Sequence, residues 1–465
     1  MDEQLVAEQL FDGLTASDPE TSEPRPALAE SWTTSTDGLV WEFSLRSDAT
    51  FSDGSPVEAS DVKATLDRAV RPASGSVVAD LLEPVVGWQA VVVEGTAEGL
   101  SGVEAVAARV VRVRLSRPWA DFASALAHPG LGVVPRGSND STFESPFPGS
   151  GPFALRSRDA DRLVLVETGG RARLPRVEIH LRASRGDAYR AFVEGDVDWA
   201  PVPLEKSDEA AARYGRAHFR SLAAELFYAF NLRSPKWADR RLREAVVRAV
   251  DTRRIIEEVY GGAMAPMRGL AVEGMLGAGD TCGDACNHDQ ARSRALLDQL
   301  RAEGGVPPEI FVDFEGDTAQ AAVAATIEDD LEAVGLVVTL RPKPLDDYER
   351  FAVTGEQDLF RLGWIAPYAS SDAVVAPLFE STSPNNLAGF SHPAVDDAIS
   401  RARSEPDAGR RTALYQDAER MVFAEFALLP VGRFLHHSVA TDAVRGIRLS
   451  VRGTFDASSV WLDDE

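Results

Sequence analysis

Apolar residues follow two different spacings along this chain, one typical of strands and one typical of helices. In the segment LVWEFSLR, Trp41, Phe43 and Leu45 alternate with other residues, which predicts a half-buried strand. In SRGDAYRAFVEGDVDW, Ser184 precedes a helical pattern that ends at Gly195, and a strand follows. Strands and helices are therefore predicted to follow one another closely in the first half of the chain.

The second half is richer in helical patterns. DRRLREAVVRAVD places its apolar residues on one helical face, and RRIIEEVYGG predicts a second helix that ends at the glycine pair. Further helices are expected at 290–303, 317–334 and 409–427, separated by the strand-like segments EIFVDF, LVVTLRP and DLFRLGW. Because the two kinds of element are mixed throughout, the sequence predicts an α/β or α+β architecture, with a change of character near residue 232.

Composition limits the classes of protein that fit. The chain has 465 residues, 44% of them apolar, and a formal net charge of −25. This length suggests two or three folding units. So negative a surface argues against nucleic acid as a partner and against binding to anionic lipid. No apolar run reaches the roughly 20 residues that span a bilayer, and the opening MDEQLVAEQLFDGL has no secretion signal. The protein is thus cytoplasmic, or a leader has been removed.

The two cysteines lie close together in TCGDACNHD, at Cys282 and Cys286. A pair at this spacing in a Gly/Asp-rich loop suits a disulfide in an oxidising compartment. Free thiols remain an alternative, and so does half of a metal site with His288, although further ligands are not apparent. A disulfide, which we expect, favours export.

The chain shows no familiar catalytic motif. It lacks a phosphate-binding loop, a dinucleotide-binding glycine pattern and a His-Glu-x-x-His pair. Ser150 in PGSGP is not a nucleophile elbow, because no glycine stands two residues before it. We therefore expect no catalytic residue, no metal site and no cofactor.

Several stretches together resemble one family. They are LFDGL, LAESW with DGLVWEFSLRSDATFSDGSPVEASDV, GSGPF, FNLRSPKWADRRLREAVVRAVDTRRII and LYQDAERMVFAEFALLPV. In this order they resemble the extracytoplasmic solute-binding proteins of peptide/nickel-type ABC importers. The resemblance implies an α/β, two-lobe periplasmic-binding-protein-like fold with an extra inserted subdomain in the first lobe. Lobe 1 would be residues 1–231, with the subdomain at about 27–147, completed by 438–465; lobe 2 would be 232–437.

The resemblance also implies a ligand site in the cleft between the lobes, near FRLGWIAPYASSD. In oligopeptide and dipeptide binders of this family, an aspartate three residues after a Gly-Trp pair binds the free amine of the peptide. Gly363 and Trp364 match that pair, but Pro367 stands at the position of the aspartate. Arg361 matches an arginine that binds the peptide carboxylate in some members. We therefore expect a site with a cationic anchor and without the usual anionic one.

Other expected site residues follow from the same resemblance. Phe434 stands where the family has a tyrosine, and Asp372 would supply an acid from the loop. The expected ligand-binding residues are Arg361, Trp364, Ala366, Tyr368, Asp372, Phe434, Phe230 and Asn231. The alternatives are core packing for Trp364 and Tyr368, a structural ion pair for Arg361, and a tie to the hinge backbone for Asn231.

The implied function is the solute-binding component of an ABC importer, a monomer that captures a small peptide or another organic solute and delivers it to permease subunits. It would act outside the cytoplasm, with a lipid anchor in the full-length protein. Family members carry a first strand and a ligand-lining loop before LFDGL, whereas nine residues precede Leu10 here, so part of the pocket is expected to differ. The alternatives are a metabolite-binding sensor or biosynthetic accessory protein on the same fold, and an enzyme that uses acids such as Asp372.

Overall fold

The computed structural model describes residues 2–138 and 147–463. It divides into two compact units, the first made of 1–201, 367–369 and 438–465, the second of 202–366 and 370–437. The predicted lobe boundary lay 30 residues later, at 231, where the helical pattern begins. The difference arises because β11 (Phe219–Phe230) pairs with strands of the second unit along its length. The end of the predicted subdomain, 139–146, lies outside the described residues.

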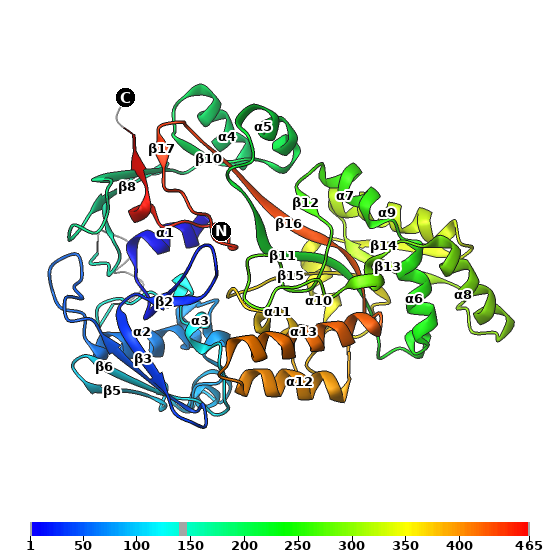
Figure 1. Ribbon diagram of the computed structural model, residues 1–465, viewed down its shortest axis with the longest axis horizontal. Helices are drawn as coiled ribbons and strands as arrows, with labels where there is room; N and C mark the ends of the chain where they lie inside the picture. The colour runs from blue at the N-terminus through cyan, green and yellow to red at the C-terminus, as the bar shows by residue number, and fades with distance from the viewer. Residues whose placement is uncertain (1, 139–146, 464–465) are drawn as a thin grey trace. The chain divides into compact units, whose positions relative to one another are not determined.

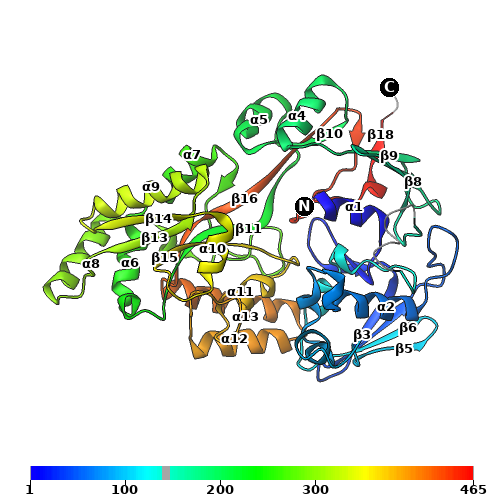
Figure 2. The same cartoon turned by 180° about the vertical axis from the view of Figure 1, so that it is seen from behind.

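The described part of the first unit contains two small sheets and two short strand pairs (Figures 1 and 2). Their order is β3-β4-β6-β5, β7-β8-β9, β1-β2 and β17-β18. The strands are β1 (Thr15–Ser17), β2 (Pro24–Pro26), β3 (Ala29–Thr34), β4 (Val40–Leu45), β5 (Val103–Ala107), β6 (Val110–Arg114), β7 (Phe153–Arg158), β8 (Arg162–Glu167), β9 (Arg176–His180), β10 (Trp199–Pro201), β17 (Val444–Arg445) and β18 (Trp461–Leu462). The helices are α1 (Asp2–Leu10), α2 (Ala59–Ala69), α3 (Phe122–Ala125) and α4 (Arg185–Glu194).

Local sequence explains several of these elements. In β4, Trp41, Phe43 and Leu45 are buried while the residues between them are half-buried, as their alternation predicted. Ser184 caps α4 by accepting a hydrogen bond from the amide of Asp187, and Gly195 ends the helix in the left-handed conformation. Both predictions are confirmed.

The second unit is built on one sheet, in which β16 lies next to β11, followed by β15, β13 and β14 (Figure 1). β13 is parallel to β14 and β15, and β11 is antiparallel to β15 and β16. The strands are β11, β12 (Met264–Ala265), β13 (Ile310–Glu315), β14 (Val338–Lys343), β15 (Leu359–Ile365) and β16 (Leu428–Ala440). β16 continues past residue 437 into the first unit, where its last residues pair with β10.

The second unit also contains several helices. They are α5 (Ser207–Tyr214), α6 (Arg240–Ala249), α7 (Thr252–Tyr260), α8 (Gln290–Ala302), α9 (Thr318–Glu332), α10 (Leu345–Ala352), α11 (Asp372–Phe379), α12 (Pro393–Ser404) and α13 (Ala408–Ala424). Residues of α6, α7, α8 and α9 form one apolar core with β11, β13 and β14. α12 and α13 lie side by side, and α11 contacts both (Figures 1 and 2).

Candidate functional site

β15 carries most of the predicted site. It lies between β11 and β13, so its backbone is held on both sides. Arg361 lies opposite Tyr228 of β11, and Trp364 lies opposite Glu225. Because side chains alternate along a strand, Arg361 and Trp364 belong to opposite faces of the sheet.

Arg361 is half-buried beside an acid. Its Nη2 is 3.6 Å from Oε1 of Glu315, and the two side chains are 24% and 14% exposed. The Nε of Arg361 is buried and has no hydrogen-bond partner among the described residues. Tyr348 donates a hydrogen bond of 2.5 Å to the backbone carbonyl of Arg361, which fixes the strand at this point. The guanidinium is thus paired on one side and retains an unused donor.

Gly363 leaves room for this arrangement. A Cβ at this position would lie 2.9 Å from the backbone oxygen of Glu225 and 3.6 Å from Nη2 of Arg361. The first distance is too short for a carbon and a backbone oxygen, so the glycine permits the close approach of β15 to β11.

Trp364 and Tyr368 both have partners within their own unit. The indole Nε1 of Trp364 donates a hydrogen bond of 2.6 Å to the carbonyl of Ala373. Tyr368 is 6% exposed and its ring meets that of Trp119 edge-on at 5.6 Å. Ala366 is buried and its amide donates to the carbonyl of Ala223. These contacts match the alternative of core packing.

Asp372 points into the protein interior. It is 1% exposed and accepts hydrogen bonds from Nε of Arg403 at 2.9 Å and from the hydroxyl of Tyr415 at 2.7 Å. The expected role for Asp372 was an acid that reaches the ligand from its loop. The structure instead gives its carboxylate two internal partners and almost no exposed surface.

The remaining predicted residues also have structural contacts. Phe230 is fully buried and packs on Trp237 at 4.7 Å. Nδ2 of Asn231 donates to two backbone carbonyls, each at 2.8 Å, in the turn before β15, which matches the alternative of a backbone tie. Phe434 is half-buried and meets the ring of Tyr260 edge-on at 5.8 Å. The structure therefore places Arg361 and Trp364 on opposite faces of β15, and Phe230 in the core.

Two buried acids of the second unit were not predicted. Glu225 is 2% exposed, and neither of its carboxylate oxygens has a hydrogen-bond partner among the described residues. Burial, with the nearby Glu419, raises the pKa of Glu225 well above its usual range. Burial also raises the pKa of Glu419 to about 7, although Thr281 donates to its carboxylate at 2.5 Å. A lone acid inside the apolar run LAAELFYAF was the available sequence signal for Glu225.

Cys282 and Cys286 are joined by a disulfide. The bond closes the loop that contains a short 3-10 helix, Gly283–Cys286. Nearby, Arg248 donates to the carboxylate of Asp284 at 2.5 Å, and this contact attaches the loop to α6. Cys282 itself is buried.

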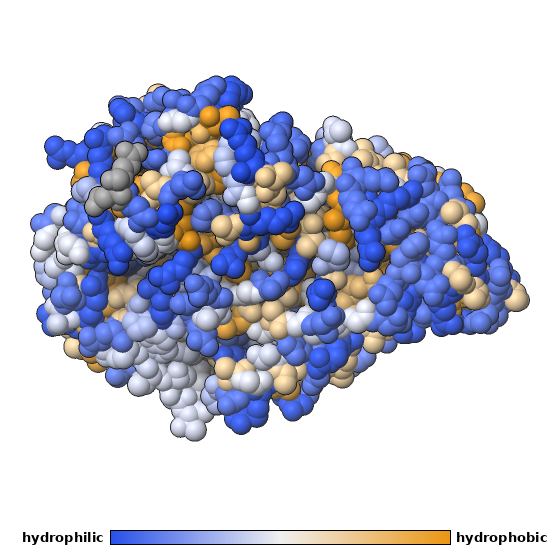
Figure 3. Space-filling view, turned by 45° about the horizontal axis from the view of Figure 1, so that its top comes forward, coloured by the Kyte–Doolittle hydropathy of each residue, from blue (hydrophilic) through white to orange (hydrophobic). Residues whose placement is uncertain are grey.

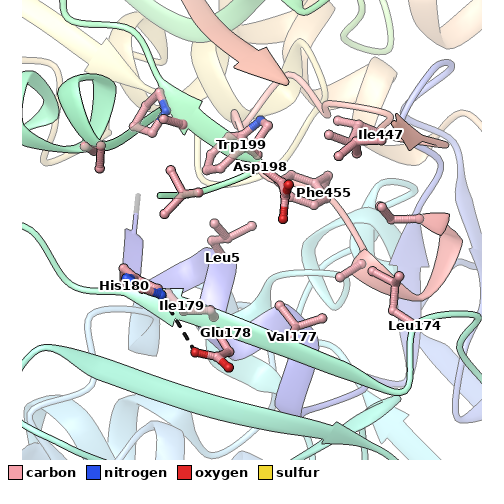
Figure 4. Close-up of a pocket in the computed structure, with 18 of the residues that line it drawn as sticks. Leu5, Leu174, Val177, Glu178, Ile179, His180, Asp198, Trp199, Ile447 and Phe455 are labelled. Atoms are coloured by element: carbon pink, nitrogen blue, oxygen red, sulfur yellow. Dashed lines mark ion pairs between the residues drawn. The ribbon is translucent and has the colours of Figure 1, made fainter. Parts of the chain in front are cut away.

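A cavity of about 630 Å³ lies within the first unit (Figure 4). Its lining comes from α1, β9, α4, β10 and the C-terminal segment. A second cavity of about 380 Å³ in the same unit is lined by residues of 8–27, 127–129 and 448–459. None of the predicted ligand-binding residues lines either cavity. Hydrophilic residues cover most of the molecular face drawn in Figure 3, in keeping with the acidic composition.

Comparison with known proteins identifies the family. Residues 23–386 match the model for the middle region of bacterial extracellular solute-binding proteins, family 5. The chain belongs to this family. The resemblance found in the sequence is therefore confirmed, and the solute-binding component of an ABC importer is the function of this family 5 protein.

Named relatives agree with this assignment. The dipeptide-binding protein DppE of Bacillus subtilis (strain 168) is 24% identical over 98% of this chain and 86% of its own. The probable deoxycholate-binding periplasmic protein YgiS of Escherichia coli (strain K12) is 28% identical over 92% and 83%. The murein tripeptide binding protein MppA of Escherichia coli, in its unliganded open form, matches with a TM-score of 0.86 at 23% identity over 99% and 93%. The fold of this family 5 protein is accordingly that of the two-lobe periplasmic binding proteins.

The family also fixes some broader properties. Family 5 proteins are extracellular solute-binding proteins, a class of transport proteins and not of enzymes. They act outside the cytoplasm and work with the permease components of ABC importers. Within residues 2–138 and 147–463, no helix is both long enough and apolar enough to cross a membrane.

Proposed function

We propose that this family 5 protein captures a small peptide, or another organic solute that carries a carboxylate, and that Arg361 on β15 contributes to its site. The observation that carries this proposal is the side chain of Arg361, which is 24% exposed and whose Nε has no hydrogen-bond partner among the described residues. A guanidinium binds a carboxylate through two parallel hydrogen bonds. A ligand carboxylate would supply the missing acceptor.

The solutes named for relatives support a carboxylate as the common feature. These names are a dipeptide for DppE, an oligopeptide for OppA, glutathione for GsiB and deoxycholate for YgiS. Peptides, glutathione and deoxycholate differ in size and polarity, but each carries a carboxylate. A single arginine that recognises this group would serve any of them.

Neither Pro367 nor Glu315 offers a comparable anchor to the amine end of a peptide. Pro367 supplies no side-chain acid, and its carbonyl accepts a hydrogen bond of 3.4 Å from Arg452. Glu315 is already paired with Arg361. Burying a free amine without a counter-charge costs several kcal/mol. We therefore propose that the solute is bound through its carboxylate and that a free amine is not required.

The test is calorimetric titration with three forms of one tripeptide: unmodified, N-acetylated and C-amidated. The unmodified and acetylated forms should bind with similar affinity, and the amidated form should bind roughly 10–100-fold more weakly, since a hydrogen bond to a charged group contributes about 1.5–3 kcal/mol. Arg361→Ala should weaken the unmodified peptide to the same degree. Arg350→Ala removes an exposed arginine of the same unit and is the matched control.

Two results would contradict the proposal. If acetylation abolishes binding while amidation does not, an acid holds the amine and the carboxylate assignment is wrong. If Arg361→Ala binds the peptide as tightly as the unchanged protein, Arg361 serves only its ion pair with Glu315.

The rest of the proposal concerns partners and location. We propose that the protein is a monomer. It should not bind nucleic acid, because its net charge is −25. It should also lack catalytic activity, because Asp372, the acid that an enzyme would have recruited, is bound to Arg403. Light scattering tests the monomer. We also propose a lipid anchor on the full-length protein, which metabolic labelling with a fatty acid tests.

A further inference from the structure

A buried acid of the second unit, Glu419 on α13, holds both ends of a long loop. Its side chain is 0% exposed and accepts hydrogen bonds from the amides of Leu270 and Ala271, at 3.1 and 3.4 Å. The hydroxyl of Thr281 donates to the same carboxylate at 2.5 Å. Because a buried carboxylate needs donors around it, these contacts fix the segment between them, which we name the 268–282 loop.

The base and the tip of this loop are also held. The amides of Thr281 and Cys282 both donate to the carbonyl of Arg268 at 2.9 Å, which closes the base. At the tip, Nε2 of Gln416 on α13 donates to the carbonyl of Gly277 at 3.1 Å. The conformation of the loop therefore depends on side chains of α13.

The tip of the 268–282 loop contacts the segment that follows β15. The carbonyl of Leu276 accepts hydrogen bonds from the amide of Ser371 at 2.8 Å and from its hydroxyl at 3.2 Å. Gly277 has a φ of +86°, and a Cβ there would collide with the hydroxyl of Ser371. The close approach of the two segments therefore requires glycine at this position.

Ser371 is connected to the strand of the proposed solute site. It directly precedes α11, and the indole Nε1 of Trp364 on β15 donates to the carbonyl of Ala373 in α11 at 2.6 Å. The same strand carries Arg361. A series of hydrogen bonds and backbone connections thus leads from Glu419 to β15, within the second unit.

We propose that Glu419 is a positioning residue for solute binding. Its carboxylate fixes the 268–282 loop, and this loop fixes the start of α11 and, through it, the end of β15. Because Glu419 is fully buried, it acts through these contacts and not by touching the solute. Binding groups keep their geometry only when the residues around them hold them in place. The inference rests on the solute site proposed for Arg361.

Two substitutions of Thr281 separate hydrogen bonding from packing. Thr281→Val keeps the shape of the side chain but removes the hydroxyl donor, whereas Thr281→Ser keeps the donor and removes a methyl group. If the carboxylate contact positions the loop, Thr281→Val should resemble Glu419→Gln, and Thr281→Ser should restore the behaviour of the unchanged protein. Packing alone predicts the opposite order. Asp417→Asn alters an acid of α13 that is 58% exposed, and is the matched control.

Hydrogen exchange and calorimetric titration are measured on each variant at a temperature where it is folded. In Glu419→Gln and Thr281→Val, the amides of Cys282 and Ser371, which donate to backbone carbonyls and not to Glu419, should exchange roughly tenfold faster. The affinity of these two variants for the unmodified tripeptide should fall roughly three- to tenfold. Thr281→Ser and Asp417→Asn should change the affinity less than about twofold.

The other outcomes overturn the proposal. Faster exchange at Cys282 with Ser371 unchanged would show that the 268–282 loop does not position the segment after β15. Faster exchange at both amides with unchanged affinity would make Glu419 a structural residue only. Weaker binding by Thr281→Ser than by Thr281→Val would assign the effect to packing. If the unchanged protein also fails to bind the tripeptide, the proposed function fails and this inference with it, a result that the unchanged protein alone reveals.

Discussion

Replacing Asp372 by asparagine tests whether its carboxylate holds the second unit together. The side chain is 1% exposed and accepts hydrogen bonds from Arg403 at 2.9 Å and Tyr415 at 2.7 Å. Arg403 is only 15% exposed, so its charge is largely withdrawn from water. The substitution keeps the shape of the side chain but leaves that cation with Glu380, also at 2.9 Å, as its acidic partner.

The expected loss of stability follows from these contacts. Removing one partner of a buried ion pair costs about 3–5 kcal/mol, because the other charge stays buried. Since Arg403 retains Glu380, we expect the lower end, about 3 kcal/mol. For a folding unit of this size, each kcal/mol lowers the melting temperature by roughly 2–4 °C, so the decrease should be roughly 6–12 °C.

Urea unfolding followed by tryptophan fluorescence measures this change, and titration of the folded variant measures solute affinity. Asp397→Asn removes an exposed acid from its i,i+4 pair with Arg401, where both side chains are 65% exposed, and should cost less than about 0.5 kcal/mol. A loss below about 1 kcal/mol for Asp372→Asn would refute the reasoning. So would an unchanged stability accompanied by weaker solute binding, because Asp372 would then act on the ligand.

Three further changes have defined outcomes. Burial raises the pKa of Glu419 to about 7 from an unperturbed 4.5. Between these pH values the folded state therefore binds more protons than the unfolded state. The free energy of unfolding should fall as the pH rises through this range, by at most roughly 3 kcal/mol. Glu419→Gln should remove that part of the pH dependence, and an unchanged profile in urea unfolding would contradict it. Gly363→Ala forces a Cβ to 2.9 Å from the backbone oxygen of Glu225. It should lower the free energy of unfolding by about 1–3 kcal/mol in the same assay. A smaller loss would show that β15 and β11 move apart easily. Replacing both Cys282 and Cys286 by serine removes a disulfide between residues four apart in sequence, and should lower the free energy of unfolding by about 2 kcal/mol. An unchanged melting temperature would mean that Arg248 alone holds the loop.

The local sequence was sufficient to predict those helices and strands that have one polar face. The alternation in β4 and the cap and stop of α4 appear in the structure where they were predicted. Ser184 and Gly195 act through backbone groups within four residues, so no distant part of the chain is needed to explain them. The order of the family segments likewise identified the fold without any coordinates.

The local sequence was not sufficient to predict a strand whose two faces are both buried. β11 is a 12-residue strand whose apolar run LAAELFYAF lacks alternation, because residues on both faces are covered. The unit boundary consequently falls at residue 201, where pairing changes, and not at 231, where composition changes.

The chemistry of the candidate site depended still more on tertiary structure. The sequence by itself determined that an arginine, a glycine, a tryptophan and a proline occupy their places near β15. It did not determine that Glu315 would lie 3.6 Å from Arg361, or that Arg403, 31 residues from Asp372, would bind that carboxylate. Spacing in the chain fixes hydrogen bonds between near neighbours, whereas the charge state and exposure of a side chain depend on residues that only folding brings within a few ångströms.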